Sequence, residues 1–328
     1  MWSRTVGKRK YVDPDVGSLI ERSGGLLDPY EVVRICAGSL LQKLAGFEAT
    51  FESAFERICI LASLAGFEVK PFRGDRRGLR GNDAIIMPSA GGNTKGTIFY
   101  NPDLPIGRII FSIAHEIAHS FFPASNTGAR FRSLSREGSK GARELEMLCH
   151  AGASELVMPL PEFRSAVERH GFGFNSVELI REPFGTSFEA CVYRMAQTAS
   201  FRAAAGLFQF RRRVSEEVGR GSLNLNLFSN VDTEKEAPPK KYRRQSFHAS
   251  QSFPGELTIP WNKSVPETSL IYRAGQTRSL QRGFERITVD GRGKEIRCYL
   301  EALPAPYQPD DAHPDHPDIL FLLTMNTA

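Results

Sequence analysis

The sequence has few cysteines, and no two of them are spaced as metal-binding or redox pairs are. Its 328 residues contain five cysteines, an odd number, and none forms a CxxC motif with another. They are Cys36, Cys59, Cys149, Cys191 and Cys298. Such a pattern is not typical of a disulfide framework or of a zinc site made from thiolates. We therefore expect buried free thiols in a reducing compartment.

The sequence also lacks a long hydrophobic run. The basic segment 1–15 is not followed by the apolar stretch of a signal peptide. The apolar segment 109–122 contains two histidines and a glutamate, and the segment 319–325 is far shorter than the roughly 20 residues of a membrane-spanning helix. The expectation is a cytoplasmic protein without a membrane partner.

A strong excess of one charge is missing as well. The chain has 42 Lys and Arg against 37 Asp and Glu, a formal net charge of +5, and 41% of its residues are hydrophobic. These values are typical of a soluble globular protein. The basic clusters at 211–213 and 240–244 are sites where phosphates would bind, but they also fit a helix end and a solvated linker. The helix end and the solvated linker are the favoured interpretation, and a nucleic-acid partner is the alternative.

Apolar periodicity predicts an α+β protein. Residues 1–29 are polar and predict a flexible N-terminal arm, whereas helical spacing follows at 30–44 and 51–64. Short strands are predicted at 67–71, 83–88 and 96–100. Further helices are predicted at about 106–121, 142–156, 161–170, 176–182, 187–198 and 201–210. We therefore predict a mostly helical domain with a small sheet at 30–213.

The composition changes after residue 213. Residues 214–256 include a stretch rich in Lys, Pro, Ser and Gln and predict a linker. From 257 onward, short strands and turns predict a small β-rich domain at 257–328, with strands at 257–259, 269–272, 286–289, 295–302 and 319–324. No motif in this domain indicates its role.

Two short helices are predicted within 176–196 around a turn at 184–187, which resembles a helix-turn-helix. The second helix would expose only Glu189, Tyr193 and Arg194 for reading bases. A plain helical hairpin packed on the catalytic domain is the favoured interpretation.

The helix predicted at 106–121 contains the pattern HExxH. His115 and His119 are four residues apart, so both imidazoles project from one helix face and reach a single zinc ion. Glu116 lies on the adjacent face, where it can take a proton from water as a general base. The helix is otherwise apolar nearly all round, and burying three such polar residues without a partner would be costly. A chance match is therefore disfavoured, and the domain predicted at 30–213 is expected to be a zincin-like catalytic domain.

A catalytic zinc site needs a third protein ligand. The next predicted helix offers Glu146 and His150, one turn apart, while Glu144 and Glu155 are further candidates. Spacing favours Glu146 or His150 and does not separate them.

The sequence resembles the ImmA/IrrE family of metallo-endopeptidases over roughly residues 30–200. The matching residues are Phe99-Tyr100-Asn101, Arg108, Ser112–His119 and the segment from Glu146 through Cys149-His150 to Met158-Pro159. The resemblance implies that Glu146 is the third zinc ligand. The family motif usually has asparagine where this chain has His150. We expect His150 to hydrogen-bond a ligand side chain, with oxyanion binding or metal ligation as alternatives, and Tyr100 is a second oxyanion candidate.

The resemblance also implies a function. Members of the family cleave a helix-turn-helix repressor, often encoded nearby, and thereby switch on stress-response or mobile-element genes. The alternatives are a DNA- or repressor-binding regulator with a structural metal site and no turnover, and an aminopeptidase or small-molecule hydrolase. An intact Glu116 favours the endopeptidase, because a purely structural site does not need it.

Overall fold

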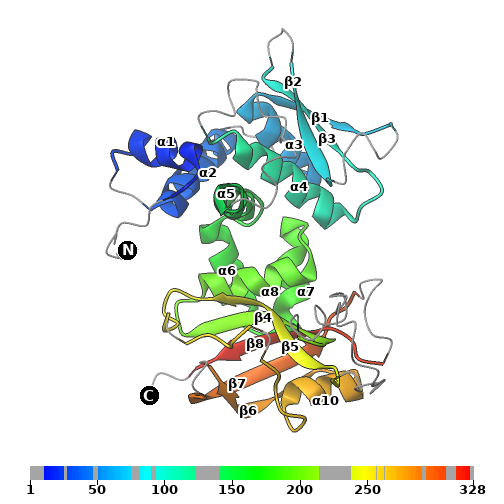
Figure 1. Ribbon diagram of the computed structural model, residues 1–328. Coiled ribbons are helices and arrows are strands. Elements are labelled where there is room, and N and C mark those ends of the chain that lie inside the picture. Colours follow the sequence, from blue (N-terminus) through cyan, green and yellow to red (C-terminus); the bar gives the residue numbers. More distant parts are fainter. Residues whose placement is uncertain are drawn as a thin grey trace, which may run out of the picture. The chain divides into compact units, whose positions relative to one another are not determined.

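The computed structural model describes residues 11–25, 28–46, 51–74, 82–89, 94–122, 140–213, 238–255, 257–261, 263–289, 293–307 and 315–325. The chain forms two compact units (Figure 1). The first comprises residues 1–165 and 179–187, and the second comprises 166–178 and 188–328. The first is mostly helical with a three-stranded sheet, and the second is built on a five-stranded sheet, which confirms the predicted α+β class.

The first unit surrounds its small sheet with helices. Its elements are α1 (Pro14–Arg22), α2 (Pro29–Ala45), α3 (Ala54–Ala65), β1 (Phe67–Pro71), β2 (Ala84–Pro88), β3 (Gly96–Tyr100), α4 (Ile106–His119) and α5 (Lys140–Val157). β3 is the central strand, parallel to β1 and antiparallel to β2. Helices α6 (Leu160–His170) and α7 (Val177–Arg181) contain points where the chain passes between the units, and η3 (Phe174–Ser176) and η4 (Glu182–Phe184) flank α7.

Helix α1 lies in the stretch for which the sequence predicted a flexible arm. Asp13 caps its N-terminus by accepting a hydrogen bond from the backbone N–H of Asp15. Val16 and Leu19 are buried in a cluster with Val33 of α2 and Leu148 of α5. The prediction was wrong for this segment because the apolar residues of so short a helix are few among polar neighbours.

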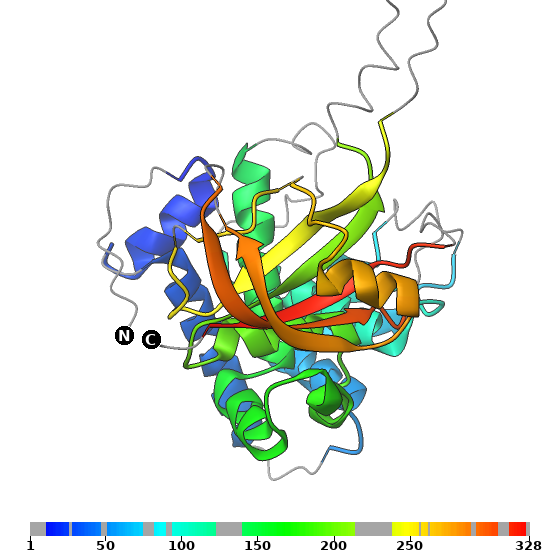
Figure 2. The ribbon, with the colours of Figure 1, turned by 90° about the horizontal axis from the view of Figure 1, so that it is seen from below.

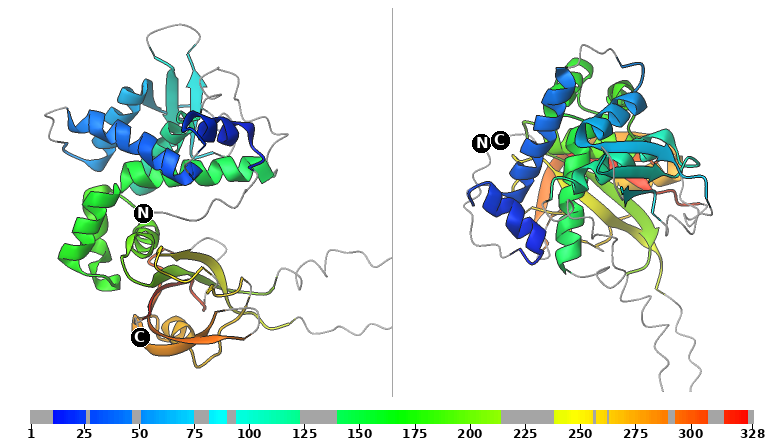
Figure 3. Two further views of the ribbon diagram at one scale, coloured as in Figure 1. Left: turned by 90° about the vertical axis from the view of Figure 1, so that its left-hand side faces the viewer. Right: turned by 90° about the horizontal axis from the view of Figure 1, so that it is seen from above.

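Helices α4 and α5 pack closely, and this contact positions the candidate site. α5 also lies along α2 (Figure 3). A Cβ atom at Gly152 of α5 would come within 2.9 Å of the Cβ of Ala118 on α4 and 3.0 Å of a methyl group of Val33. Only glycine therefore permits this approach without a shift of the neighbours. The glycine lets the N-terminal half of α5 reach the histidine-bearing end of α4.

The second unit contains a five-stranded antiparallel sheet with strand order β5-β4-β8-β7-β6 (Figure 2). Its strands are β4 (Ala203–Arg211), β5 (Lys241–Ala249), β6 (Gln281–Thr288), β7 (Glu295–Pro304) and β8 (Ile319–Thr324). Helix α8 (Phe188–Thr198) packs on β4 and β5, and α10 (Leu270–Thr277) packs on β6 and β7. Strands β5 and β6 are the two edges.

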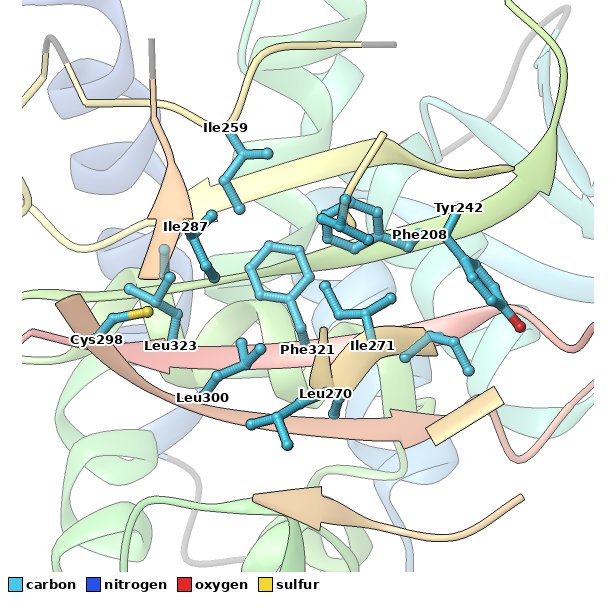
Figure 4. Close-up of a cluster of buried hydrophobic side chains, with 14 of the residues drawn as sticks. Phe208, Tyr242, Ile259, Leu270, Ile271, Ile287, Cys298, Leu300, Phe321 and Leu323 are labelled. Atoms are coloured by element: carbon cyan, nitrogen blue, oxygen red, sulfur yellow. The ribbon is translucent and has the colours of Figure 1, made fainter. Parts of the chain in front are cut away.

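The core of the second unit lies between α10 and the sheet. Phe208, Tyr242, Ile271 and Phe321 are buried there and point toward one another (Figure 4). The rings of Phe208 and Phe321 are 5.4 Å apart, and the Tyr242 hydroxyl donates a 3.1 Å hydrogen bond to the carbonyl of Pro317. Burial of these apolar side chains stabilises the sheet.

Several element predictions in the second unit were wrong. Residues 203–211 form strand β4 rather than a helix, because β4 is buried on both faces and its continuous apolar run has no period-2 signal. Residues 270–277 form helix α10, capped by Ser269, where a strand was expected, and 257–259 form no strand. β5 lies inside the stretch predicted as linker, of which 214–237 and 256 lie outside the described residues.

Among the helices in the described part of the chain, none combines the length and apolar character required to span a bilayer.

Candidate metal centre

The two histidines of the HExxH pattern lie on the last turns of α4 with their rings together. Nε2 of His115 is 3.2 Å from Nε2 of His119, and the ring planes are nearly perpendicular, at 80°. His115 is 8% exposed and Glu116 between them is 6% exposed. The i, i+4 spacing on a helix produces this pairing directly. At this distance, only one of the two nitrogens can carry a proton that points at the other nitrogen. The pair is therefore suited to binding one cation between them.

Glu146 of α5 supplies a carboxylate to the same point. Its Oε2 lies 3.1 Å from Nε2 of His115, and its Oε1 lies 3.8 Å from Nε2 of His119. Glu144 instead accepts a hydrogen bond from the backbone N–H of Val12, and Glu155 forms an ion pair with Arg34 at 3.3 Å. Of the three glutamates considered from the sequence, the structure therefore brings only Glu146 to the histidines.

The three donor atoms fit a metal ion. Ligand atoms bound tetrahedrally to zinc at about 2.0–2.1 Å are roughly 3.3–3.4 Å apart. The nitrogen–nitrogen and nitrogen–oxygen separations of 3.2, 3.1 and 3.8 Å bracket this value. Two imidazoles and one carboxylate leave one tetrahedral position open, which is the ligand number of catalytic rather than structural zinc sites.

Glu116 lies next to the three candidate ligands and is not one of them. Its carboxylate lies within 4.8 Å of the ligand atoms of both His115 and His119, and the side chain is buried. This position, next to the histidine nitrogens, is one from which a carboxylate can exchange a proton with a molecule bound there.

Cys149 contacts the centre, and the sequence analysis had assigned it no role there. Its thiol sulfur lies 3.3 Å from Nδ1 of His119, on the ring edge opposite the shared point, and the residue is fully buried. When Nε2 of His119 binds a metal, its Nδ1 carries the proton and donates it to sulfur. Nδ1 of His115 is buried without a hydrogen-bond partner among the described residues. The spacing of Cys149, one turn after Glu146, was the available signal.

We expect Cys149→Ala to weaken metal binding by roughly 10–100-fold, the usual effect of losing a partner of a ligating histidine. Cys149→Ser keeps a hydrogen-bonding group and should retain most of the affinity. Cys191→Ala is the matched control, since Cys191 is also fully buried but lies in the second unit. Competition with a chelating dye measures the affinity, and equal values for the Ala variants would rule out the contact's role.

His150 also lies at the centre, at its exposed side. Its ring is stacked on Phe111 of α4 at 5.7 Å and 20°, and it lies 4.7 Å from the ring of His115. His150, His115 and Glu146 form a second group whose ligand atoms are within 4.8 Å of one another. The ring of Phe111, one turn before His115, thus fixes the orientation of a third imidazole beside the histidine–carboxylate group.

Tyr100 lies at the end of β3, where its ring contacts Phe55 edge-on at 5.7 Å. Burial, and to a lesser extent the nearby Cys59, raises its pKa. Within the described ranges, no hydrogen bond or ring contact joins Tyr100 to the two α4 histidines. Tyr100 is half-buried and packs against Phe55 at the end of β3.

Arg108 connects the site helix to the small sheet. Its guanidinium donates two hydrogen bonds, of 2.6 and 3.0 Å, to the carboxylate of Asp83, the residue before β2. A bidentate pair of this kind fixes direction as well as distance. Arg108 thereby orients the first turn of α4, the helix that presents both histidines.

The predicted helix-turn-helix-like segment does form helices, but it does not present a base-reading face. Arg194 of α8 is only 5% exposed. The Tyr193 hydroxyl lies 2.7 Å from that of Ser246 on β5, and it also donates a hydrogen bond to Glu189. Because these side chains are occupied inside the second unit, the expectation that they are exposed was wrong.

Comparison with known proteins gives a family for part of the chain. Residues 62–196 match the peptidase M78 family, described as the IrrE N-terminal-like domain, and this range contains both α4 and α5. No curated protein matches the chain. A similar solved structure is a Mycobacterium tuberculosis transcriptional regulator, with a TM-score of 0.46 and 14% identity over 94% of this chain and 80% of that one.

Proposed function

We propose, from the premise that residues 62–196 are an IrrE N-terminal-like domain of the peptidase M78 family, that this chain is a zinc-dependent endopeptidase. Its substrate in this proposal is one specific protein, a helix-turn-helix transcriptional repressor. Cleavage relieves repression in a stress response or in the control of a mobile element.

One observation carries the proposal: Nε2 of His115, Nε2 of His119 and a carboxylate oxygen of Glu146 converge with separations of 3.1–3.8 Å. Two imidazoles and a carboxylate with one open tetrahedral position are a ligand set of catalytic zinc sites. Glu116 adjoins the same point. A structural metal site would be expected to have four protein ligands and no neighbouring base.

The residues divide the chemistry among them. His115, His119 and Glu146 would hold the zinc ion, which would supply Lewis acidity toward a carbonyl and toward water. The carboxylate of Glu116 takes a proton from the attacking water and passes it to the leaving amine. His150, oriented by Phe111, is placed to donate a hydrogen bond to the carbonyl oxygen of the substrate as negative charge develops there.

The substrate assignment rests on the family resemblance. Members of the family cut repressors that are often encoded nearby, so a repressor gene adjacent to the gene of this chain is the first candidate. The exposed position of His150 and the open ligand position are consistent with access by a protein segment.

The test is metal removal with that repressor as substrate. The chelated protein should leave the repressor intact, and stoichiometric zinc should restore a single cut that mass spectrometry locates, whereas magnesium should not. Repressor incubated with zinc alone is the control. Binding of the repressor without cleavage, in the presence of bound zinc, would contradict the peptidase and support the regulator without turnover.

A further inference from the structure

The outer face of the β6–β7 hairpin carries an unusual set of side chains. Along β6 the exposed residues alternate with half-buried ones, and β7 shows the same alternation. The alternation places one set of residues on the face away from the core. This face, called here the hairpin face, comprises Arg282, Phe284 and Arg286 of β6 and Glu295, Arg297, Tyr299 and Glu301 of β7.

Two aromatic rings form the centre of the hairpin face. Phe284 and Tyr299 are direct cross-strand partners, with ring centroids 5.4 Å apart and planes at 74°. Phe284 is 58% exposed, more than any other phenylalanine among the exposed large apolar residues of the described chain. Leaving so large an apolar ring in water is unfavourable unless a partner covers it.

Two arginines stand directly opposite each other beside these rings. Arg286 of β6 pairs in register with Arg297 of β7, and like charges at opposed positions destabilise a sheet. The guanidinium of Arg297 lies 4.9 Å from the centre of the Phe284 ring. In the described part of the chain, neither arginine has a carboxylate within ion-pair distance.

At the opposite end of the hairpin, the charged side chains have hydrogen-bond partners. Arg282 donates a hydrogen bond to the side chain of Asn175, and Glu301 accepts one from the backbone N–H of Phe174. Within the described hairpin, the opposed like charges are thus confined to Arg286 and Arg297, beside Phe284. An anion bound between Arg286 and Arg297 would remove the repulsion between them.

The two basic clusters seen in the sequence do not provide a comparable surface. Arg243 is only 3% exposed and its Nε donates to the carbonyl of Arg211. Arg211 in turn donates to the carbonyl of Arg244 and lies over the ring of Trp261 at 5.7 Å. These arginines support the β4–β5 pair rather than an external phosphate.

A second copy of the chain does not fit the hairpin face. β6 is an edge strand, and antiparallel pairing of two copies about Phe284 would place Arg282 of one against Arg286 of the other. An acidic peptide would satisfy the arginines, but it would cover Phe284 and Tyr299 with flat rings only if it also carried aromatic side chains beside its carboxylates. A strand of unpaired bases supplies both phosphates and flat apolar faces.

We propose that the hairpin face binds single-stranded nucleic acid, with a base stacked on Phe284 beside Tyr299 and the adjoining phosphate between Arg286 and Arg297. This binding adds to the proposed peptidase function and does not depend on it. Double-stranded nucleic acid should not bind the hairpin face in this way, because the faces of its paired bases are stacked and not exposed.

The test measures the anisotropy of fluorescein-labelled oligonucleotides of about 15 nucleotides, DNA and RNA, with the full chain. Phe284→Ala should weaken binding roughly 5- to 150-fold, as loss of one stacked base does, while Phe284→Trp should keep it. Arg286→Gln with Arg297→Gln should reduce the slope of log affinity against log salt by about 0.7, the value for the one phosphate that the two arginines share.

Arg273→Gln is the matched control, because Arg273 is exposed on α10, away from the hairpin face. It should leave affinity and salt slope unchanged. Unaltered binding by the Phe284→Ala and double arginine variants would overturn the proposal, as would equal affinity for a duplex of the same length. Absence of wild-type binding at low salt would overturn it too. No peptidase substrate is present, so the outcome is independent of cleavage.

Discussion

Glu116→Gln should bind zinc as well as the wild-type protein does and lose repressor cleavage by roughly 10²–10⁴-fold, the range that a positioned general base contributes. The exchange keeps the shape and hydrogen-bonding capacity of a buried side chain that is 6% exposed. It removes only the ability to accept a proton and pass it on. The metal ligands on either side, His115 and His119, remain on the same helix.

The measurement pairs zinc content with the rate of cleavage in the same preparation. Equal zinc in both proteins shows that the loss is chemical rather than a failure to fold or to bind metal. A Glu116→Gln variant that cuts at the wild-type rate would remove Glu116 from the mechanism. A variant that loses zinc as well would show that the carboxylate is needed to hold the metal.

The sequence predicted the part of the site that a single helix creates. His115, Glu116 and His119 are local, so their spacing alone determines that they share one turn of α4. Glu146 is 31 residues from His115 along the chain, and only the resemblance to a family selected it over His150. The choice between Glu146 and His150 depends on how α5 crosses α4. Gly152 permits this crossing, and no local sequence pattern predicts it.

The fold was predictable where burial is one-sided and was missed where it is not. α2 and β3 show clear periodicity, and both were assigned correctly. β4 is buried on both faces in the middle of the sheet, and α10 is a short helix whose cap, Ser269, resembles a turn. The contact between Cys149 and His119 was not predicted, because a buried thiol is usually inert packing.

Glu146→Gln should weaken zinc binding by more than the roughly 10–100-fold that follows loss of a ligand's outer partner, because it removes the only charged ligand. The neutral amide cannot offset the charge of the metal, and two imidazoles alone leave it under-coordinated. Competition with a chelating dye at fixed pH measures the effect. Glu144→Gln is the matched control: it is the same exchange on the same helix, at a residue that bonds to Val12 instead.

The contrast with His150 decides between the two groups of ligand atoms that share His115. His150→Asn should keep the zinc affinity within a few-fold and reduce the rate of cleavage, since His150 is exposed and stacked on Phe111 rather than placed between the two α4 histidines. If instead His150→Asn loses zinc and Glu146→Gln keeps it, the third ligand is the imidazole. The 3.1 Å approach of Glu146 to His115 would then be an ordinary hydrogen bond, and the carboxylate would orient that histidine for the metal.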